Sequence, residues 1–205
     1  MNKKDYIIRR EDETEYREVE NLVRDSFWNV YMPGCLEHFV LHELRNDPHF
    51  IPELDLVMER NGEIIGQIIG VEASIKCDDG TFTKVLTFGP LAIRNDLKGN
   101  GYGREFMLYV VEKAKEMGYG AILFEGNNSF YSKSGFRLAQ EYGIRYPEMG
   151  FVPFLNCMEL IPGYLDSVTG EYLTPEGYFV DKDKAEEFDR TFPPKEKIRT
   201  DSQIF

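Results

Sequence analysis

The 205-residue chain is poor in the residues that build covalent or metal-based scaffolds, since it contains three cysteines and three histidines. Cys35, Cys77 and Cys157 are far apart and odd in number, which excludes a disulfide framework and a zinc knuckle. His38 and His42 could share one face of a helix, but no HExxH pattern surrounds them. We therefore predict no metal site and interpret the cysteines as small hydrophobic residues.

The sequence also lacks a long apolar run and an excess of positive charge. No segment approaches the roughly 20 consecutive apolar residues of a membrane span, and no apolar signal-peptide region follows Met1–Asp5. The 36 acidic and 24 basic residues give a formal net charge of −12, which argues against nucleic acid or a membrane as a partner. We expect a cytoplasmic protein.

Hydrophobic periodicity predicts a strand and two helices at the start of the chain. Tyr6–Ile8 has the pattern of a strand, and Asp12 with Glu15 resembles a capping box for a helix that runs to Phe27. A second helix is expected over Leu36–Arg45. Its apolar face would consist of Phe39, Val40 and Leu44.

The middle of the chain predicts an antiparallel meander followed by a crossover. Turn residues at Asn61-Gly62 and Asp78-Asp79-Gly80 separate three expected strands: Leu54–Glu59, Glu63–Ile75 and Phe82–Ile93. A helix should then end at Gly118, with an inward face of Phe106, Val110, Val111, Ala114 and Met117. Ala121–Phe124 would return as a buried strand parallel to Phe82–Ile93, because such crossovers are right-handed and short.

The last third of the chain predicts a core that ends near residue 160 and an extension over residues 161–205. Phe136–Leu138 and Val152–Leu160 would supply two more strands of the core. The extension is rich in aromatic residues, so we expect it to pack either on the core or on a second subunit, and a homodimer is left open. A last helix is expected at Asp183–Arg190, and the tail from Pro193 onwards should fray.

A glycine-alternating segment, Lys98-Gly99-Asn100-Gly101-Tyr102-Gly103, enters the third predicted helix. Such a loop can direct several unpaired N–H groups at one point, where the helix dipole also favours an anion. The alternative is a tight turn in which the glycines serve geometry alone. Two common phosphate motifs do not fit, because Arg104 and Phe106 stand where a dinucleotide fingerprint needs glycine and no Gly-Lys-Ser/Thr follows.

The glycine segment, together with Tyr131-x-x-x-Gly135-Phe136 after the next strand, resembles the GCN5-related N-acetyltransferase family. The family signature at the loop is Arg or Gln, two residues, Gly, one residue, then Gly or Ala. Gly101 and Gly103 match this signature and Lys98 departs from it. The resemblance covers about Tyr6 to Leu160 and implies an α+β fold of α/β/α sandwich type. Its central sheet would be mixed, mostly antiparallel and flanked by helices, with a splay between the fourth and fifth strands.

The resemblance also implies an acetyl-CoA site, with acetyl-CoA as co-substrate and no metal. The pyrophosphate would lie on the amides of residues 99–104, and the pantetheine arm would pair with the fourth strand and with Asn127 or Asn128. The expected cofactor-binding residues are Leu91, Ala92, Ile93, Lys98, Gly99, Asn100, Gly101, Tyr102, Gly103, Arg104, Asn128 and Tyr131.

By the same resemblance, Tyr131 would protonate the departing thiolate of CoA. Glu72 and Glu125 are both candidates for the general base. The sequence thus predicts an acetyltransferase that moves the acetyl group of acetyl-CoA to an amine of a small molecule or peptide by direct transfer in a ternary complex. Transfer of another acyl group and a non-catalytic acyl-CoA-binding sensor or partner module on the same fold are the alternatives.

Overall fold

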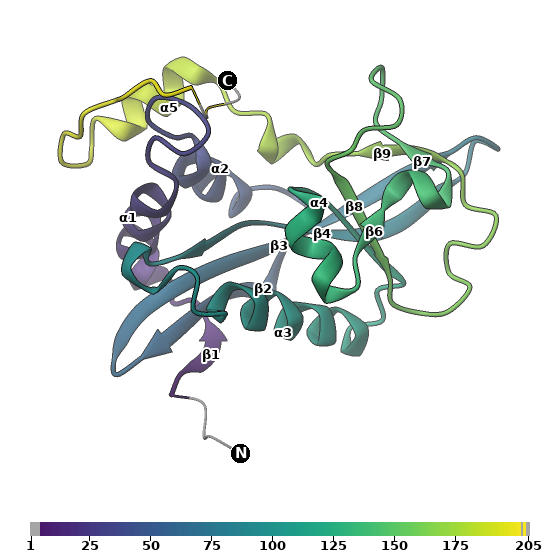
Figure 1. Ribbon diagram of the computed structural model, residues 1–205, viewed down its shortest axis with the longest axis horizontal. Coiled ribbons are helices and arrows are strands. Elements are labelled where there is room, and N and C mark those ends of the chain that lie inside the picture. The colour runs from purple at the N-terminus through teal and green to yellow at the C-terminus, as the bar shows by residue number, and fades with distance from the viewer. Residues whose placement is uncertain (1–4, 202, 204–205) are drawn as a thin grey trace. The chain divides into compact units, whose positions relative to one another are not determined.

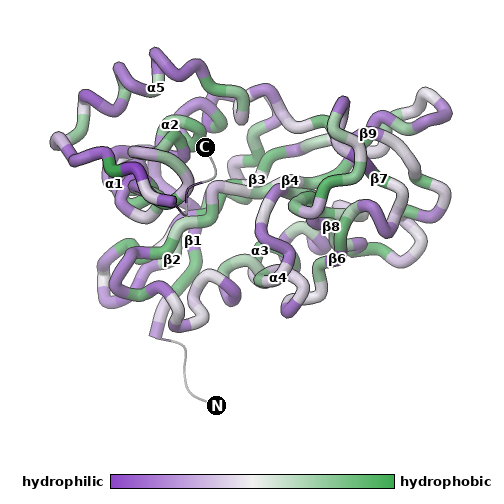
Figure 2. The backbone as a smooth tube through the Cα atoms, turned by 45° about the horizontal axis from the view of Figure 1, so that its top comes forward, coloured by the Kyte–Doolittle hydropathy of each residue, from purple (hydrophilic) through white to green (hydrophobic). Residues whose placement is uncertain are grey.

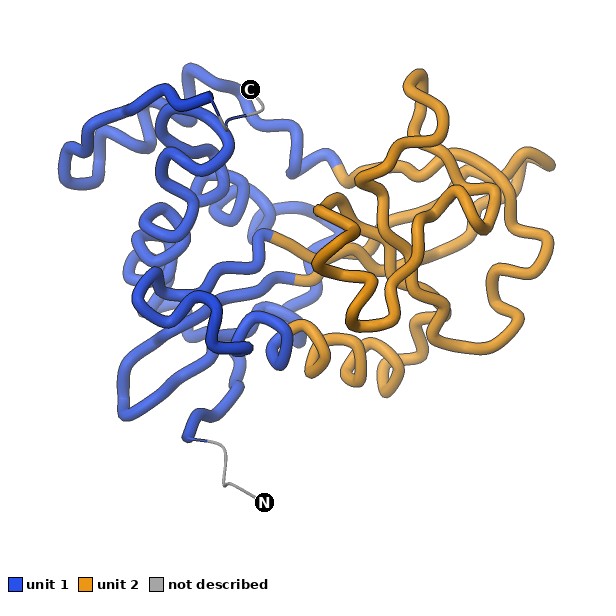
Figure 3. The backbone as a smooth tube through the Cα atoms, in the orientation of Figure 1, with its two compact units in different colours: residues 1–69, 90–106, 176–205 blue, residues 70–89, 107–175 orange. Residues whose placement is uncertain are grey.

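A computed structural model describes residues 5–201 and 203, which form two compact units (Figure 3). The first unit comprises the described parts of Met1–Ile69, Pro90–Phe106 and Glu176–Phe205, and the second comprises Gly70–Gly89 and Met107–Pro175. The segment expected as one C-terminal extension is therefore divided, with residues 161–175 in the second unit and residues 176–203 in the first. No helix in the described part of the chain is long and apolar enough to cross a bilayer.

The first unit begins as the sequence predicts. Strand β1 (Ile7–Arg10) pairs antiparallel with β2 (Phe50–Arg60), and the carboxylate of Asp12 accepts from Thr14 N in a capping box completed by Glu15. A short 3-10 turn, η1 (Glu13–Glu15), leads into α1 (Tyr16–Phe27), and α2 (Glu37–Leu44) follows. Both helices are thus confirmed, with α2 one residue shorter at each end than expected and the capping box placed on η1. Leu41 replaces the expected Val40 among the buried residues of α2.

The C-terminal segment of the first unit is ordered around α1 and α2. A 3-10 turn, η5 (Glu176–Tyr178), precedes α5 (Lys182–Asp189), which starts at the N-cap Asp181. Figure 1 shows α1, α2 and α5 side by side, and Figure 2 shows α5 as largely hydrophilic. The prediction that the tail after Pro193 frays is wrong for its described part: Trp28 Nε1 donates to the Glu196 carbonyl at 2.9 Å.

A buried ion cluster connects several elements of the first unit. The Arg45 guanidinium donates to both carboxylate oxygens of Glu11 at 2.8 Å and to Glu20 at 3.0 Å, and it lies 3.5 Å from Asp55. All four side chains are at most 5% exposed. Three carboxylates share one guanidinium, so it is unfavourable to bury all of them in the charged form. Burial therefore raises the pKa of Glu11 to about 8. Asp55 adds to this rise through its negative charge.

The sheet is mixed, as predicted, with hydrogen-bonded order β1-β2-β3-β4-β5-β8-β6. Strands β3 (Glu63–Cys77) and β4 (Phe82–Ile93) follow the expected hairpin turns, in which Asn61, Gly62 and Gly80 have positive φ. Strand β4 is continuous through Gly89, which has a φ of 130°, and through Pro90, which supplies no N–H donor.

Strand β5 (Ala121–Glu125) organises the second unit. It pairs parallel with β4 at Leu86↔Ile122, which confirms the predicted crossover, and antiparallel with β8 (Leu155–Glu159). Helix α3 (Tyr102–Glu116) buries four of the expected residues, but the prediction for Met117 is wrong. Met117 lies beyond the end of the helix and is 41% exposed.

Short elements complete the second unit. Helix α4 (Asn128–Tyr131) and the 3-10 turn η3 (Ser132–Ser134) precede β6 (Arg137–Leu138), which pairs with β8. A 3-10 turn, η4 (Ala139–Tyr142), leads to β7 (Ile144–Arg145). The unpredicted β9 (Gly170–Leu173) pairs with both β3 and β7, and it places Tyr172 in the core of this unit.

Candidate functional site

The glycine segment forms the connection between β4 and α3 in the first unit. After a 3-10 turn, η2 (Asn95–Leu97), the chain takes positive φ angles at Gly99 (80°) and Gly101 (89°), and α3 begins at Tyr102. No neighbouring atom lies within 4 Å of a Cβ built at either glycine. Backbone conformation and not space therefore requires glycine at these two positions.

Gly103 differs from the two glycines before it. A Cβ at this position would lie 3.6 Å from Ile93 Cγ1, which is an ordinary van der Waals contact. Its φ is not in the positive region, because Gly103 already belongs to the first turn of α3. The fold of the loop therefore does not demand glycine at position 103.

The loop presents a run of unsatisfied backbone donors. Among the residues that the structure describes, the N–H groups of residues 99–103 donate to no protein acceptor, and the first helical bond is Glu105 N to Gly101 O at 3.1 Å. These five consecutive groups stand at the N-terminus of the 15-residue helix α3, where the dipole adds partial positive charge. Such an arrangement can hold a phosphate or another anion.

Side chains around the loop attach it to the C-terminus of α1. The Lys98 ammonium donates to the Ser26 carbonyl at 2.5 Å, and the Asn95 amide donates to the Asp25 carbonyl at 2.8 Å. The Ser26 hydroxyl in turn donates to the Ile93 carbonyl at 3.1 Å. Partial burial lowers the pKa of Lys98. The residue that departs from the family signature thus places its charge at the negative end of α1.

The end of β4 lies beside the loop in the same unit. Ala92 and Ile93 are buried and Leu91 is half-buried. A Cβ on Gly66 would lie 2.6 Å from Ile93 Cδ1 and 3.0 Å from the Ala92 carbonyl, so β3 approaches this end of β4 closely because it has a glycine there. The three strand residues and the loop residues predicted to bind a cofactor are therefore brought together.

Tyr131 belongs to the second unit, where packing fixes its ring. Its centroid lies 4.5 Å from that of Phe124 in an edge-on arrangement, and Phe136 lies 6.2 Å away. A Cβ on Gly126 would come within 2.4 Å of the ring, so glycine is needed beneath it. Tyr131 thus stands at the carboxyl end of β5, where the strand gives way to α4.

The two neighbouring asparagines have different roles. Asn127 caps α4, since its side-chain oxygen accepts from Ser129 N at 3.0 Å. The Asn128 amide donates to the buried Asn156 side chain at 2.9 Å, and Asn156 donates to the Gly126 carbonyl at 2.8 Å. Asn156 thereby ties the short helix to the end of β5. Asn127 serves as the turn residue that its type predicts.

The two candidate bases lie on different strands, Glu72 on β3 and Glu125 on β5. Glu72 is ion-paired with Lys84 at 2.7 Å and accepts from the hydroxyl of Tyr119, two residues before β5 begins. Glu125 ends the strand, at the same end as Tyr131. The role of either carboxylate as the base stays a prediction.

Glu125 has partners that the sequence did not reveal. The Tyr146 hydroxyl lies 2.8 Å from the Glu125 carboxylate and 2.8 Å from the Thr174 hydroxyl. Burial raises the pKa of Tyr146 to about 12, so this residue stays a hydrogen-bond donor at neutral pH. No sequence pattern links these three residues, which are up to 49 positions apart in the numbering.

Comparison with known proteins identifies the class. A model of the acetyltransferase (GNAT) family matches residues 11–136, and the chain belongs to this family. It is similar to the uncharacterized N-acetyltransferase YhbS of Escherichia coli K12, with 25% identity over 164 residues, 80% of this chain and 93% of the relative. It is also similar to the uncharacterized N-acetyltransferase YvbK of Bacillus subtilis, with 31% identity over 86 residues, 37% of this chain and 56% of the relative.

Solved structures agree with this assignment of the fold. Escherichia coli YhbS in complex with CoA has a TM-score of 0.74 at 24% identity and covers 85% of this chain and 92% of its own. A Brucella melitensis GNAT family acetyltransferase in complex with acetyl-CoA has a TM-score of 0.66 at 18% identity, covering 85% and 98%. No cluster of three His, Cys, Asp or Glu side chains suited to a metal occurs among the described residues.

Proposed function

We propose that this protein is an acetyl-CoA-dependent N-acetyltransferase that acts on an amine of a small molecule or peptide by direct transfer in a ternary complex. The observation that carries the proposal is the run of five unpartnered N–H groups, residues 99–103, at the N-terminus of α3. Membership of the GNAT family supports acyl transfer, and the similar structures bound to CoA and acetyl-CoA support the cofactor.

The first unit would hold the cofactor. The amides of residues 99–104 bind the pyrophosphate, as the loop conformation and the helix dipole favour. Gly103, which the fold does not require, then gives the pyrophosphate close access to the backbone. Lys98 sets the loop against α1 through its bond to Ser26, and Leu91, Ala92 and Ile93 offer strand backbone to the amides of the pantetheine arm.

The proton chemistry is assigned to Tyr131, which follows β5 in the chain, and to one of the two candidate carboxylates. Tyr131 donates a proton to the CoA thiolate as it leaves, a useful but modest contribution because a thiol of pKa near 8.5 is a fair leaving group. Asn128 adds a contact to the pantetheine arm. Glu72 and Glu125 remain the candidates for the base, and the shared location with Tyr131 at the end of β5 favours Glu125.

A thermal melt combined with a thiol-release assay tests the proposal. Saturating acetyl-CoA should stabilise the protein by a few kcal/mol, and a panel of amines should identify at least one that releases free CoA. No stabilisation at millimolar acetyl-CoA would overturn the cofactor assignment. Stabilisation by acetyl-CoA without thiol release across the panel would instead indicate that the protein is a non-catalytic sensor or partner module.

A further inference from the structure

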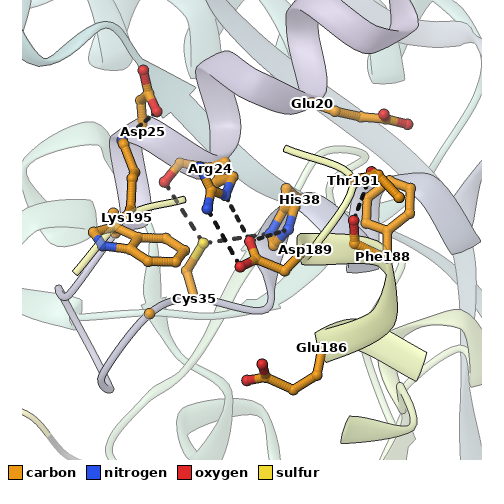
Figure 4. A network of polar contacts seen from close by, with 12 residues as sticks. Glu20, Arg24, Asp25, Cys35, His38, Glu186, Phe188, Asp189, Thr191 and Lys195 are labelled. Atoms are coloured by element: carbon orange, nitrogen blue, oxygen red, sulfur yellow. Dashed lines mark hydrogen bonds and ion pairs between the residues drawn. The ribbon is translucent and has the colours of Figure 1, made fainter. Parts of the chain in front are cut away.

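A second group of reactive side chains lies in the first unit, outside the site proposed for acetyl transfer to amines. Figure 4 shows Cys35, His38, Asp189 and Arg24 joined by polar contacts where α1, α2 and α5 meet. Cys35 precedes α2, His38 lies in its first turn, and Asp189 ends α5. No local sequence pattern indicates this group, because Asp189 is 151 to 165 residues from the other three along the chain.

The geometry is that of a thiol, a base and an orienting carboxylate. Cys35 Sγ lies 3.4 Å from His38 Nδ1, and His38 Nε2 lies 3.2 Å from Asp189 Oδ1. The second contact is short but not linear, since Nε2 has no partner that meets hydrogen-bond geometry among the described residues. Arg24 holds the carboxylate through Nε at 2.6 Å and Nη2 at 3.3 Å. A nucleophile within reach of a base that a third group orients is the pattern of nucleophilic catalysis.

The protonation states suit a general base better than a preformed thiolate. Burial lowers the pKa of His38 to about 4; the charges of Arg24 and Arg17 also lower it, and that of Asp189 opposes them. Burial, with the charges of Glu37 and Asp189, raises the pKa of the Cys35 thiol. At neutral pH the thiol is therefore protonated and the imidazole is neutral. The Asp189 carboxylate beside Nε2 favours the tautomer of His38 that carries its proton on Nε2. The lone pair of Nδ1 is then directed toward Cys35.

We propose that Cys35, His38 and Asp189 form a second nucleophilic centre, at which the acyl group of a thioester is transferred to Cys35 Sγ. In this step the S–C bond to Cys35 forms and the thioester C–S bond breaks. The thiol proton moves to His38 Nδ1 and then to the departing thiolate, so the products are acyl-Cys35 and a free thiol. Asp189 acts as a positioning residue and as counter-ion to the transient imidazolium.

The end of α1 indicates an acyl-CoA as the thioester. Cys35 Sγ lies 3.6 Å from the Arg24 carbonyl. The next two carbonyls, of Asp25 and Ser26, accept from Asn95 of η2 and from Lys98 at the start of the glycine segment. One turn of helix thus contacts both the thiol and the loop proposed for the pyrophosphate. The choice of donor rests on the proposed function, whereas the thiol centre rests on its own geometry.

Labelling of the full-length protein without an amine acceptor tests the centre. After incubation with acetyl-CoA, peptide mass spectrometry should find one hydroxylamine-sensitive acetyl group on Cys35. Cys77 and Cys157 serve as internal controls, because both are buried and neither lies beside an imidazole. Equal labelling of all three cysteines, or none on Cys35, would overturn the proposal.

Variants and a pH profile separate base catalysis from simple thiol reactivity. His38→Gln should slow labelling of Cys35 by about 100-fold, and Asp189→Asn should slow it less. In the parent protein the labelling rate should be constant from pH 6 to 8, because His38 is neutral throughout. A rise of about tenfold per pH unit would show reaction through the free thiolate and refute the role of His38. This pH profile is measured on the parent protein, so it does not depend on whether a variant folds.

A donor without the nucleotide keeps the two proposals distinguishable. S-acetyl-N-acetylcysteamine carries the same thioester but has no pyrophosphate to bind. If it labels Cys35 selectively while acetyl-CoA neither stabilises nor labels the protein, the thiol centre stands and the proposed cofactor site fails. If acetyl-CoA stabilises the protein and neither donor labels Cys35 ahead of Cys77 and Cys157, the proposed function stands and the thiol centre is refuted.

Discussion

At the scale of single residues, the position of Tyr131 depends on what lies beneath its ring. Gly126 leaves room for the ring, and Phe124 and Phe136 meet it edge-on. These contacts involve the carbon frame of the side chain and not its hydroxyl. The packing of Tyr131 and its proposed role as proton donor can therefore be separated by one substitution.

We expect Tyr131→Phe to lower the turnover number for amine acetylation by about 10- to 100-fold. The affinity for acetyl-CoA should change little, because the ring and its aromatic neighbours are kept. Steady-state kinetics from pH 6 to 9 and a binding titration check both parts. Tyr109→Phe, the same change on α3, is the matched control and should leave turnover unchanged. Equal rates for Tyr131→Phe and the parent across this range would remove the assignment as acid.

At the scale of elements, the loop between β4 and α3 owes its shape to two glycines with positive φ. A β-branched residue at Gly101 would oppose this conformation even though the surrounding space is open. Gly80, in the turn between β3 and β4, has nearly the same φ of 88° and equally open surroundings. The chain thus contains a matched pair of strained turns, one at the proposed site and one remote from it in sequence.

Gly101→Val should abolish stabilisation by acetyl-CoA, because the N–H groups of the loop would no longer converge. Each of the two substitutions should lower the free energy of unfolding by about 1–2 kcal/mol. Gly80→Val, however, should leave the cofactor-induced shift in melting temperature unchanged. Thermal melts with and without acetyl-CoA measure both effects. If both variants keep the shift, the loop conformation is not what binds the cofactor.

The bond between Lys98 and the Ser26 carbonyl attaches this loop to the end of α1. Lys98→Met keeps the length of the side chain but removes the bond to the Ser26 carbonyl, one of the last acceptors of the helix. We expect a loss of about 1 kcal/mol in the free energy of unfolding. Lys76→Met, on an exposed position of β3, is the control and should be close to neutral. Denaturant titrations that give equal values for the two variants would contradict the capping role of Lys98.

The sequence predicted the elements whose signals are local and missed those that depend on distant partners. Positive φ angles in the turns at Gly62 and Gly80, and the capping box at Asp12, follow from residues a few positions apart. The four-residue β9 has no periodicity of its own and is defined by pairing with β3 and β7. Likewise, the Tyr146–Glu125 contact and the Asp189 network join residues that no local pattern connects.

At the scale of the whole molecule, two buried groups make stability depend on pH in opposite directions. Glu11 has its pKa raised from 4.5 to about 8, so it stabilises the fold below pH 4.5 and loses this contribution as the pH rises to 8. His38 has its pKa lowered from 6.5 to about 4, so its burial costs stability at low pH and that cost disappears as the pH rises to 6.5. Between pH 4.5 and 6.5 the two contributions offset each other.

Stability should therefore fall from pH 6.5 to 8, with a slope of up to about 1.4 kcal/mol per pH unit for one proton. Burial also raises the pKa of Asp55, which acts in the same direction. Glu11→Gln mimics the protonated acid and should flatten the fall, as urea titrations at several pH values would measure. A parent protein whose stability is constant or rises between pH 6.5 and 8 would show that Glu11 is ionised in the folded state.

The cluster around Arg45 also affects the heat of unfolding. Because folded Glu11 retains a proton at pH 7 that the unfolded chain gives up, each molecule that unfolds acidifies its solution. The buffer takes up this proton and adds its own heat of protonation to the signal. Calorimetric enthalpies measured in Tris and in phosphate at the same pH should therefore differ, and the difference should shrink in Glu11→Gln. The difference between the two buffers would then give the number of protons that each molecule releases when it unfolds.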